Sequence, residues 1–497
     1  MEYSTEKTSS LGPSGTRRSP SVGYDADQQQ QEQQDVEYIR LRQKTSRRKV
    51  DSSVLPLLFL GLLVFQLDRM NLASALTANF TTDIKVTQAT INLGNQLMFL
   101  GIVILEIPAN LLLQKLGPRK WLSLQVLIFG IVATMQVFVK NRTGFLLVRL
   151  VLGLCEAGYI PGSSYTLSCW YTRRELSKRT AILFFGMFGG NALSPILASG
   201  ILKLGGRKGL KAWQWLFLLE GLFTVVVAIL LFFFLPGTPN RPRPLGSAGL
   251  VHFTEEDKEI LTARLELDDQ ERHETNRSPI PLRLVWKTLC HYKRWPHYIS
   301  TFCVFSTWSP LTTYTPSIIL ALGFNRISAN ALAAVGAALS LLVVFLIAYL
   351  SDSTNRRGAS VILAQSLYLI ALLLAYSIQP HVGKWSRFGL WTLVNAFAVG
   401  YHPSHNSWVQ LNCKTSGERS IAVAMWVMSA ISGLMAGTQY FQAKDGPRYQ
   451  RGLRTMIIMV SVGIASALFQ DLVYWVHNRQ VLKKGLEKDP DTYIYVL

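Results

Sequence analysis

Twelve apolar segments recur along the chain, each close to the length of about 20 residues with which an α-helix crosses a bilayer. In the hydrocarbon core every backbone polar group must be bonded internally, so each segment predicts a transmembrane helix. The chain is therefore expected to be an all-α integral membrane protein. The predicted spans are residues 54–76, 92–114, 121–139, 144–166, 181–203, 213–235, 297–320, 329–350, 359–378, 386–408, 420–441 and 455–476.

The composition excludes several classes of protein. The net charge is +20, from 50 Lys and Arg against 30 Asp and Glu, yet charged residues make up only 16% of the chain. A nucleic-acid-binding protein carries a dense basic face, so the expected surroundings are a lipid bilayer and not nucleic acid. The five cysteines have no metal-ligand spacing, and neither a phosphate-binding loop nor a catalytic triad stands out. The sequence thus predicts no enzyme, no metal and no cofactor.

A long polar gap divides the spans into two groups of six. Its proline-rich start and one acidic-to-basic stretch at 255–267 predict a soluble linker with a surface helix. The first 53 residues are rich in Ser, Gln and charge, which is typical of a disordered tail. The predicted units are a tail at 1–53, an N-terminal half at 54–235, a linker at 236–296, a C-terminal half at 297–476 and a tail at 477–497.

The distribution of Lys and Arg predicts the orientation. With both termini placed inside, the inside segments hold about 31 of these residues and the outside loops about 14. This bias favours both termini and the linker in the cytoplasm. Two glycosylation triplets, at Asn79 and Asn141, then fall in outside loops, whereas the triplet at Asn276 falls inside and is expected to stay unmodified.

Two halves of six helices are typical of secondary transporters built from repeats. Internal sequence similarity supports a repeat. The junction after the second span and the junction after the eighth both have a polar residue at the helix end, with basic residues shortly after it. The residues concerned, which we expect to act in gating, are Gln114, Arg119, Asp352 and Arg356.

These junctions resemble, in part, the loop signature of the major facilitator superfamily. Asn110 and Gln114 depart from its usual Gly and Asp, and Asn355 replaces a Gly in the second copy. A larger set of motifs is similar to the fungal anion:cation symporter branch of that superfamily, which includes allantoate, nicotinate, pantothenate and biotin permeases. The pieces are Leu67-Asp68-Arg69-Met70-Asn71, Arg149 to Gly158 with Pro161-Gly162, Trp170 to Glu175, Trp213 to Gly221, Leu235 to Pro239, Phe253 to Glu256 and Asp445 to Tyr449. The resemblance implies the major facilitator fold.

Ionisable residues inside the spans are candidates for function, because a charge at bilayer depth is costly unless it is paired or hydrated. Asp68 and Arg69 lie in the first span. They either form buried ion pairs that lock the helices together, or face a cavity in which Arg69 binds a carboxylate and Asp68 exchanges a proton. The resemblance implies that this Arg contacts the substrate carboxylate.

Arg149 and Glu156 lie seven residues apart in the fourth span, which places them two turns apart on one face of a helix. Apolar surroundings favour the protonated form of a carboxyl group, and the resemblance implies a proton-linked carboxylate at Glu156. The alternative is a neutral Glu156 bonded to a neighbouring helix, with Arg149 reaching the membrane interface. We expect Arg149 to act in gating, and Glu106 and Glu220 to be structural.

Further candidates for substrate contacts come from polar residues in other spans. His402 and His405 are spaced to share one face of a helix, and Pro403 should break or kink it. Both histidines are either satisfied groups at a kink or contributors to substrate choice. The predicted substrate-binding residues are Arg69, Asn71, Asn191, Tyr314, His402 and Asn406.

The sequence therefore predicts a monomeric, proton-coupled symporter of the plasma membrane that takes up a small organic carboxylate, such as a vitamin, a nicotinate-like anion or a ureide anion. Asp68 and Glu156 are the predicted proton-coupling residues. Two alternatives stay open: an exporter or organellar transporter of a secondary metabolite, and a nutrient receptor that does not transport.

Overall fold

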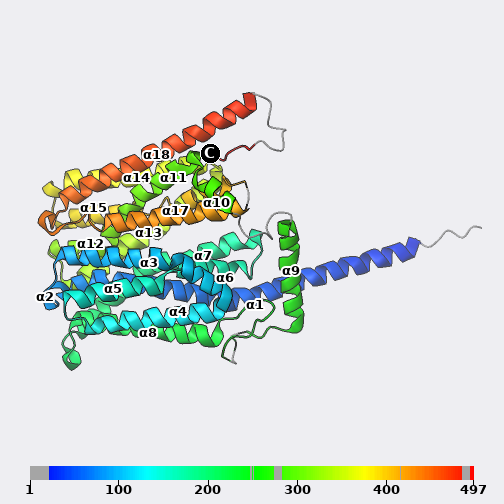
Figure 1. Ribbon diagram of the computed structural model, residues 1–497, viewed down its shortest axis with the longest axis horizontal. Coiled ribbons are helices and arrows are strands. Elements are labelled where there is room, and N and C mark those ends of the chain that lie inside the picture. Colours follow the sequence, from blue (N-terminus) through cyan, green and yellow to red (C-terminus); the bar gives the residue numbers. More distant parts are fainter. Residues whose placement is uncertain (1–21, 247–248, 250, 274–281, 415, 484–492) are drawn as a thin grey trace, which may run out of the picture.

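A computed structural model of the 497-residue chain describes residues 22–246, 249, 251–273, 282–414, 416–483 and 493–497. Its long helices run side by side in two groups, and the linker helix α9 (Glu255–His273) lies across one end (Figure 1). We call the end with α9 the linker side, and the opposite end the loop side. The described C-terminal residues also lie on the linker side, where the first helix begins.

Six helical passes form the N-terminal half. They are α1 (Val22–Leu76), α3 (Gln88–Leu116), α4 (Pro118–Met135), α5 (Arg142–Glu156) with α6 (Tyr159–Ser168), α7 (Arg173–Ile201) and α8 (Ala212–Phe234). The short α2 (Phe80–Asp83) caps the loop side of this half.

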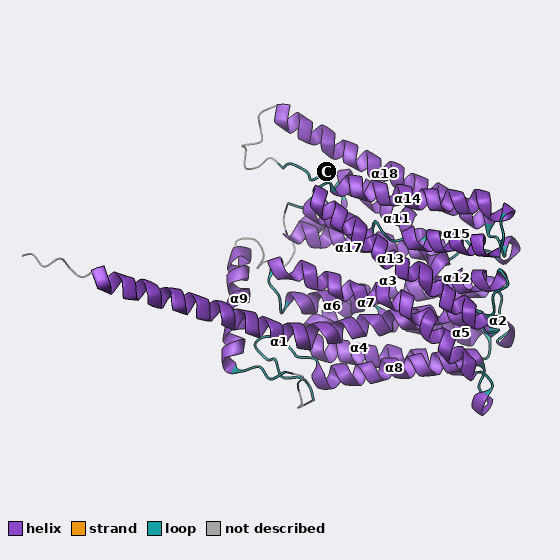
Figure 2. Cartoon of the chain, turned by 180° about the vertical axis from the view of Figure 1, so that it is seen from behind, coloured by secondary structure: helices purple, strands orange, loops and turns teal. Residues whose placement is uncertain are grey.

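Six further passes form the C-terminal half, which follows α9 and α10 (Leu282–Leu289). They are α11 (Trp295–Ser306) with α12 (Trp308–Ala321), α13 (Arg326–Thr354), α14 (Arg357–Ile378), α15 (Lys384–Phe397) with α16 (His402–Leu411), α17 (Ser416–Gly437) and α18 (Gln450–Lys483). Figure 2 shows the same arrangement from behind, with helices as the dominant structure.

The prediction of twelve spans in two halves is confirmed, with three of the spans broken. Within the described residues, nine helical segments are long and apolar enough to cross a membrane, and Ile421–Gly437 is a shorter tenth. The fourth, seventh and tenth spans are each divided into two shorter helices. The expected break at Pro403 is confirmed, because α16 begins at His402 with this proline in its first turn.

The surface of the bundle is apolar where a membrane would contact it. On α13, Leu342, Phe345, Leu346 and Tyr349 are all about 60% exposed or more, and their spacing places them on one face of the helix. Such a stripe on a soluble protein would drive aggregation. It therefore indicates a face that contacts lipid.

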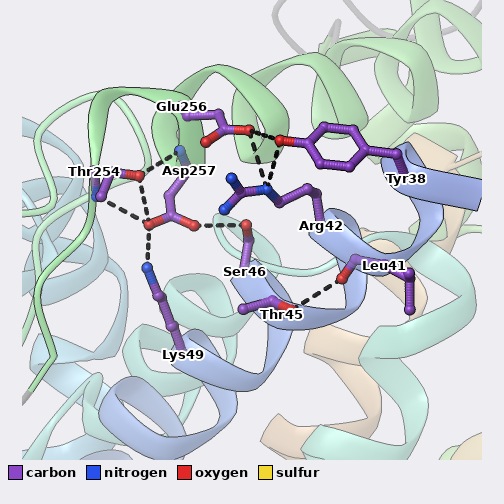
Figure 3. A network of polar contacts seen from close by, with 9 residues as sticks. All are labelled: Tyr38, Leu41, Arg42, Thr45, Ser46, Lys49, Thr254, Glu256 and Asp257. Carbon is purple, nitrogen blue, oxygen red and sulfur yellow. Dashed lines mark hydrogen bonds and ion pairs between the residues drawn. The ribbon is translucent and has the colours of Figure 1, made fainter. Parts of the chain in front are cut away.

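The predicted disordered tail requires a correction. From Val22 onwards this segment is helical and continuous with the first span, whereas residues 1–21 lie outside the described residues. Two physical reasons explain the helix: Gln, Glu, Lys and Arg are good helix formers, and the segment docks against α9. Lys49 Nζ lies 2.5 Å from Asp257 Oδ2, and Ser46 Oγ donates to Asp257 Oδ1 at 2.7 Å (Figure 3).

Acidic side chains join the linker helix to the N-terminal half. Burial acts to raise the pKa of Asp257, but hydrogen bonds from Lys49, Ser46 and Thr254 outweigh it and lower the pKa to about 2. On α7, Glu175 lies 3.1 Å from Arg47 of α1 and 2.7 Å from Arg264 of α9. The linker helix therefore belongs structurally to the N-terminal half.

The C-terminal residues pack against the other half. Tyr495 exchanges two backbone hydrogen bonds with the Asn478 amide, at 2.7 and 2.8 Å, and its ring stacks on Tyr474 with a centroid distance of 4.2 Å. Asn412 forms a similar pair of bonds with Val496. The segment 493–497 thus crosses the linker-side ends of α16 and α18.

Candidate functional site

A cavity of about 670 Å³ lies between the two halves. Its wall on the N-terminal half carries most of the charge, whereas its wall on the C-terminal half is mainly apolar and includes large aromatic side chains. The charged and amide residues include Arg69, Glu106, Asn110, Arg149 and Glu156, and the facing residues include Phe305, Trp308, His402, Asn406 and Trp426. Exposed Arg419 lines it towards the linker side.

Arg69 and Glu156 form an ion pair in this cavity. Arg69 Nε donates to Glu156 Oε2 at 2.7 Å, and the guanidinium group lies 4.1 Å from the centroid of the Phe65 ring. The Glu156 side chain is fully buried, whereas that of Arg69 keeps 16% of its surface exposed. Among the described residues no other hydrogen bond to the Arg69 guanidinium is found, so its terminal nitrogens are available to a ligand.

Glu156 sits at a break in the fourth span. It is the last residue of α5, and Gly158 follows with a φ of +79°, a conformation that favours glycine. Two polar side chains stabilise the break: Gln125 Nε2 donates to the Ala157 carbonyl at 2.6 Å, and Glu106 Oε2 accepts from the Gly158 N–H at 3.2 Å. Broken helices commonly shape the binding sites of transporters.

The sequence reasoning overlooked Gln125 and placed Glu106 away from the substrate site. Glu106 lines the cavity in addition to stabilising the break. A signal was available in both cases, since each is a polar side chain inside an apolar span and therefore needs a specific partner.

Arg149 lines the cavity on the same helix as Glu156, in agreement with their two-turn spacing. It is only 1% exposed. Its Nη2 donates to Asn95 Oδ1 at 2.5 Å, whereas Nε and Nη1 have no hydrogen-bond partner among the described residues. The guanidinium therefore remains buried and does not reach the membrane interface.

Asp68 and Asn71 face away from the cavity. Asp68 is fully buried and accepts a hydrogen bond from Thr224 of α8 at 3.0 Å. With its amide oriented to satisfy its neighbours, Asn71 donates to the Leu67 carbonyl at 3.1 Å and to Glu220. Neither residue lines the cavity, so α1 presents Arg69 to the cavity and these two residues to α8.

The predicted candidates in the C-terminal half separate in the same way. His402 lines the cavity between Phe305 and Trp426, with centroid distances of 4.9 and 4.6 Å. Asn406 also lines it. His405 instead lies inside the half, where its Nε2 is 3.0 Å from His297 Nδ1.

Two further predicted contacts lie elsewhere. Asn191 Oδ1 accepts a hydrogen bond from Gln66 Nε2 at 2.7 Å, and the Tyr314 hydroxyl donates to Asn92 Oδ1 at 2.5 Å. Neither residue lines the cavity in this structure, because each is engaged in packing between helices.

Apart from Arg149, the predicted gating residues lie on the linker side. Arg119 donates to the Arg243 carbonyl of the linker, and Asp352 pairs with Arg357, not with the exposed Arg356. The side chain of Gln114 lies outside the described residues. Within the described ranges, no group of three or more His, Cys, Asp or Glu side chains could hold a metal ion.

The sequence of this chain matches the profile of the Major Facilitator Superfamily over residues 58–438. The chain belongs to this superfamily. Its homologues are non-enzymatic transport proteins, so the chain is a membrane transporter and not an enzyme.

Comparisons with individual proteins agree with this assignment. An uncharacterized transporter of Saccharomyces cerevisiae is 26% identical over 435 residues, which cover 87% of this chain and 80% of that protein. A putative tartrate transporter of Agrobacterium vitis is 27% identical over 370 residues, which cover 71% and 78%. The crystal structure of a D-xylose–proton symporter superposes with a TM-score of 0.63 at 13% identity, over 84% of this chain and 96% of that one, which supports the fold.

Proposed function

We propose that this transporter is a proton-coupled symporter of the anion:cation symporter branch, and that its substrate is a small organic carboxylate. The observation that carries the proposal is Arg69, a cation inside the cavity whose terminal nitrogens have no protein partner among the described residues. A planar guanidinium binds carboxylates through two parallel hydrogen bonds. A relative named as a putative tartrate transporter agrees with an anionic substrate.

The ion pair between Arg69 and Glu156 supplies a means of coupling. While Glu156 is ionised, it neutralises Arg69 at 2.7 Å and competes with a substrate anion. A proton on Glu156 removes this competition and leaves the guanidinium charge to bind the carboxylate. Proton and anion then enter the cavity together, which is the thermodynamic requirement of symport.

The facing wall suggests how the remainder of the substrate is held. Phe305, Trp308 and Trp426 offer flat apolar surfaces, and His402 and Asn406 offer hydrogen-bonding groups. This combination suits a small planar anion with polar ring atoms or amide groups, which includes nicotinate-like and ureide anions.

Asp68 enters this scheme as a second acidic group that assists Glu156. It points towards α8 and away from the cavity, and Glu220 on α8 is also buried. Among the described residues neither carboxyl group has a cation in contact, and two buried carboxylates near each other would repel. We propose that the pair stores a proton next to α1.

The orientation follows from the charge bias of the loops. We place the linker side in the cytoplasm, with the loop side and its two sequons outside the cell and the protein in the plasma membrane. Inward symport is then driven by the proton gradient, because one proton together with a monovalent carboxylate carries no net charge across the membrane.

Uptake into proteoliposomes tests the proposal. Radiolabelled nicotinate, tartrate and allantoate are offered with an acidic outer medium and an alkaline lumen. We expect at least one to accumulate and the accumulation to fall at least tenfold in an Arg69→Ala variant, since a charge-assisted carboxylate contact is worth about 1.5–3 kcal/mol. Arg69→Lys should retain part of the uptake, because lysine keeps the positive charge but cannot form the two parallel hydrogen bonds of a guanidinium group.

The matched control is Lys208→Ala, which removes a cation from the exposed loop-side surface. Parental uptake by the Arg69→Ala variant would refute the role of Arg69 in binding. Uptake that increases when the outer medium is made alkaline would instead favour an exporter working by proton exchange.

A further inference from the structure

All the hydrogen bonds found between the two halves, within the described residues, lie towards the loop side. On α3, Asn92 Nδ2 donates to the Phe441 carbonyl at 3.0 Å, and Gln88 Nε2 donates to the same oxygen at 3.1 Å. The Tyr314 hydroxyl bonds to Asn92 as well, and Asn330 Nδ2 donates to Thr77 Oγ1 at 2.8 Å. The structure is therefore closed on the loop side by neutral amides.

One member of this closure also reaches into the cavity. Asn95 lies on the same face of α3, three residues after Asn92, and is only 5% exposed. Its Nδ2 donates to Thr313 Oγ1 of α12 at 3.1 Å, and its Oδ1 accepts from Arg149 Nη2 at 2.5 Å. Thr313 in turn donates to the Ser309 carbonyl at 3.0 Å. A single amide therefore connects a cation of one half to a hydroxyl group of the other.

The state of Arg149 should be sensitive to charge in the cavity. It has two nitrogens without a partner among the described residues, and it shares a helix with Glu156. An anion that enters the cavity attracts this guanidinium, whereas in the present structure the charge of Glu156 is already neutralised by Arg69. If Arg149 turns to meet that charge, Asn95 Oδ1 loses its donor, and a buried carbonyl oxygen without a donor is unfavourable.

We propose that Asn95 is a positioning residue that relays the charge state of the cavity to the loop-side closure, through Arg149 on one side and Thr313 on the other. With Arg149 on Asn95, the amide is held in the orientation that donates to Thr313, and the loop side is closed. With Arg149 drawn away, the amide is released and the halves separate on that side. This relay deepens the proposed function, but its test needs no substrate.

Cysteine labelling measures the closure directly. The five native cysteines are replaced by alanine, and Leu434→Cys supplies a reporter, since Leu434 is buried, lines the cavity and lies one turn before the loop-side end of α17. A membrane-impermeant maleimide is then applied from the loop side or from the linker side.

We expect slow loop-side labelling in this parent. Asn95→Ala and Thr313→Val should each raise the rate about three- to tenfold, the range set by one buried hydrogen bond. Thr313→Ser is the matched control and should stay at the parental rate, because it keeps the hydroxyl group. Linker-side labelling should fall as loop-side labelling rises, whereas a misfolded variant would be labelled faster from both sides.

Arg149→Met distinguishes a relay from a simple latch. Arg149 has no hydrogen bond to the described part of the C-terminal half. A latch made of Asn95 and Thr313 alone therefore predicts the parental rate, and that result would overturn the relay. We expect this variant to be labelled from the loop side as fast as Asn95→Ala.

If Arg149→Met fails to reach the membrane, a double variant still tests the Asn95–Thr313 contact on which the relay depends. Asn95→Ala combined with Thr313→Val should be labelled no faster than the faster single variant, since both remove the same contact. Fully multiplicative effects, or parental rates in both single variants, would refute the relay. Transport of a carboxylate is not required for any of these outcomes, so failure of the relay and failure of the proposed function remain distinguishable.

Discussion

At the scale of the residue, two neighbours in sequence have different surroundings. Adjacent residues on a helix point about 100° apart, and α1 uses this angle to direct Arg69 into the cavity and Asp68 towards Thr224 of α8. Arg69 then meets Glu156, which lies 87 positions later in the chain. The chemistry of the site therefore depends on the pair and not on the Asp-Arg dipeptide.

A Glu156→Gln variant should separate transport from its driving force. The amide cannot release a proton and no longer neutralises Arg69, so anion binding should become insensitive to pH. We expect exchange of labelled for unlabelled substrate to persist, while accumulation driven by a proton gradient falls to the background. Counterflow and net uptake, measured on the same proteoliposomes, check this.

Glu259→Gln is the matched control for this variant, since it changes an exposed glutamate on α9 without a hydrogen bond to the site. Proton-driven accumulation that survives in Glu156→Gln would exclude this carboxyl group as the coupling site.

At the scale of the element, the break between α5 and α6 depends on a side chain from a third helix. Gln125 of α4 is 3% exposed and donates to the carbonyls of Cys155 and Ala157. These carbonyls have lost their helical partners, because the chain leaves the helix at Ala157. The position of Glu156 thus depends on α4.

Replacing Gln125 by Leu should destabilise the protein by about 1–3 kcal/mol, the cost of leaving a buried carbonyl without a donor. Thermal unfolding in detergent, followed by the fluorescence of the native tryptophans, measures the change. Leu124→Ala is the control on the exposed face of the same helix. An unfolding temperature equal to that of the control would show that Gln125 does not stabilise the break.

The contact between α1 and α9 provides a second prediction at this scale. Folding lowers the pKa of Asp257 from 3.8 to about 2. The ionised carboxylate therefore stabilises the folded chain at any pH at which the group is ionised in the unfolded chain as well. This stabilisation is fully present above about pH 4 and is lost as the pH falls towards 2. From pH 5 to 8 it should therefore be constant.

An Asp257→Asn variant should loosen α9 throughout that range, because the amide cannot pair with Lys49. Limited proteolysis of the linker in nanodiscs should proceed several-fold faster in this variant than in the parent, at pH 5 and at pH 8 alike. Glu259→Gln again serves as the control. A parental cleavage rate in Asp257→Asn would mean that this network does not hold the linker helix.

At the scale of the whole molecule, the two halves contribute unequally to the cavity. The N-terminal half supplies the charged pair, and the C-terminal half supplies a mainly apolar wall that includes Trp308 and Trp426. The linker helix is joined to the N-terminal half by ion pairs, whereas the segment 493–497 packs on the C-terminal half. Each half thus holds its own additional segment on the linker side.

The orientation of the molecule can be tested through its sequons. Asn79 and Asn141 are both exposed on the loop side. If that side faces the exterior, expression in a glycosylating host should give a protein whose electrophoretic mobility shifts on treatment with an N-glycosidase. The Asn79→Gln/Asn141→Gln double variant should lose the shift, and Asn276→Gln should keep it. A shift that depends on Asn276 would reverse the orientation.

The sequence by itself determined the membrane class, the twelve spans and their division into halves, and it singled out Arg69, Arg149 and Glu156 as candidates. Hydropathy and the cost of buried charge are local properties, so single segments reveal them. Helix formation from Val22 depends partly on contacts with a linker more than 200 residues away, which explains why composition alone predicted disorder.

Only the tertiary structure decided which polar residues share a cavity. The sequence analysis predicted Asn71, Asn191 and Tyr314 as substrate ligands and overlooked Asn95 and Gln125. The position of a residue along a helix does not reveal which neighbouring helix its side chain contacts. The amides at Gln88, Asn92 and Asn95 repeat at helical spacing and lie on one face of α3. Their bonds that close the loop side are visible only with the second half packed against that face. Pairing across the interface is a property of the assembled halves, and this is the physical reason that it could not be derived from either half alone.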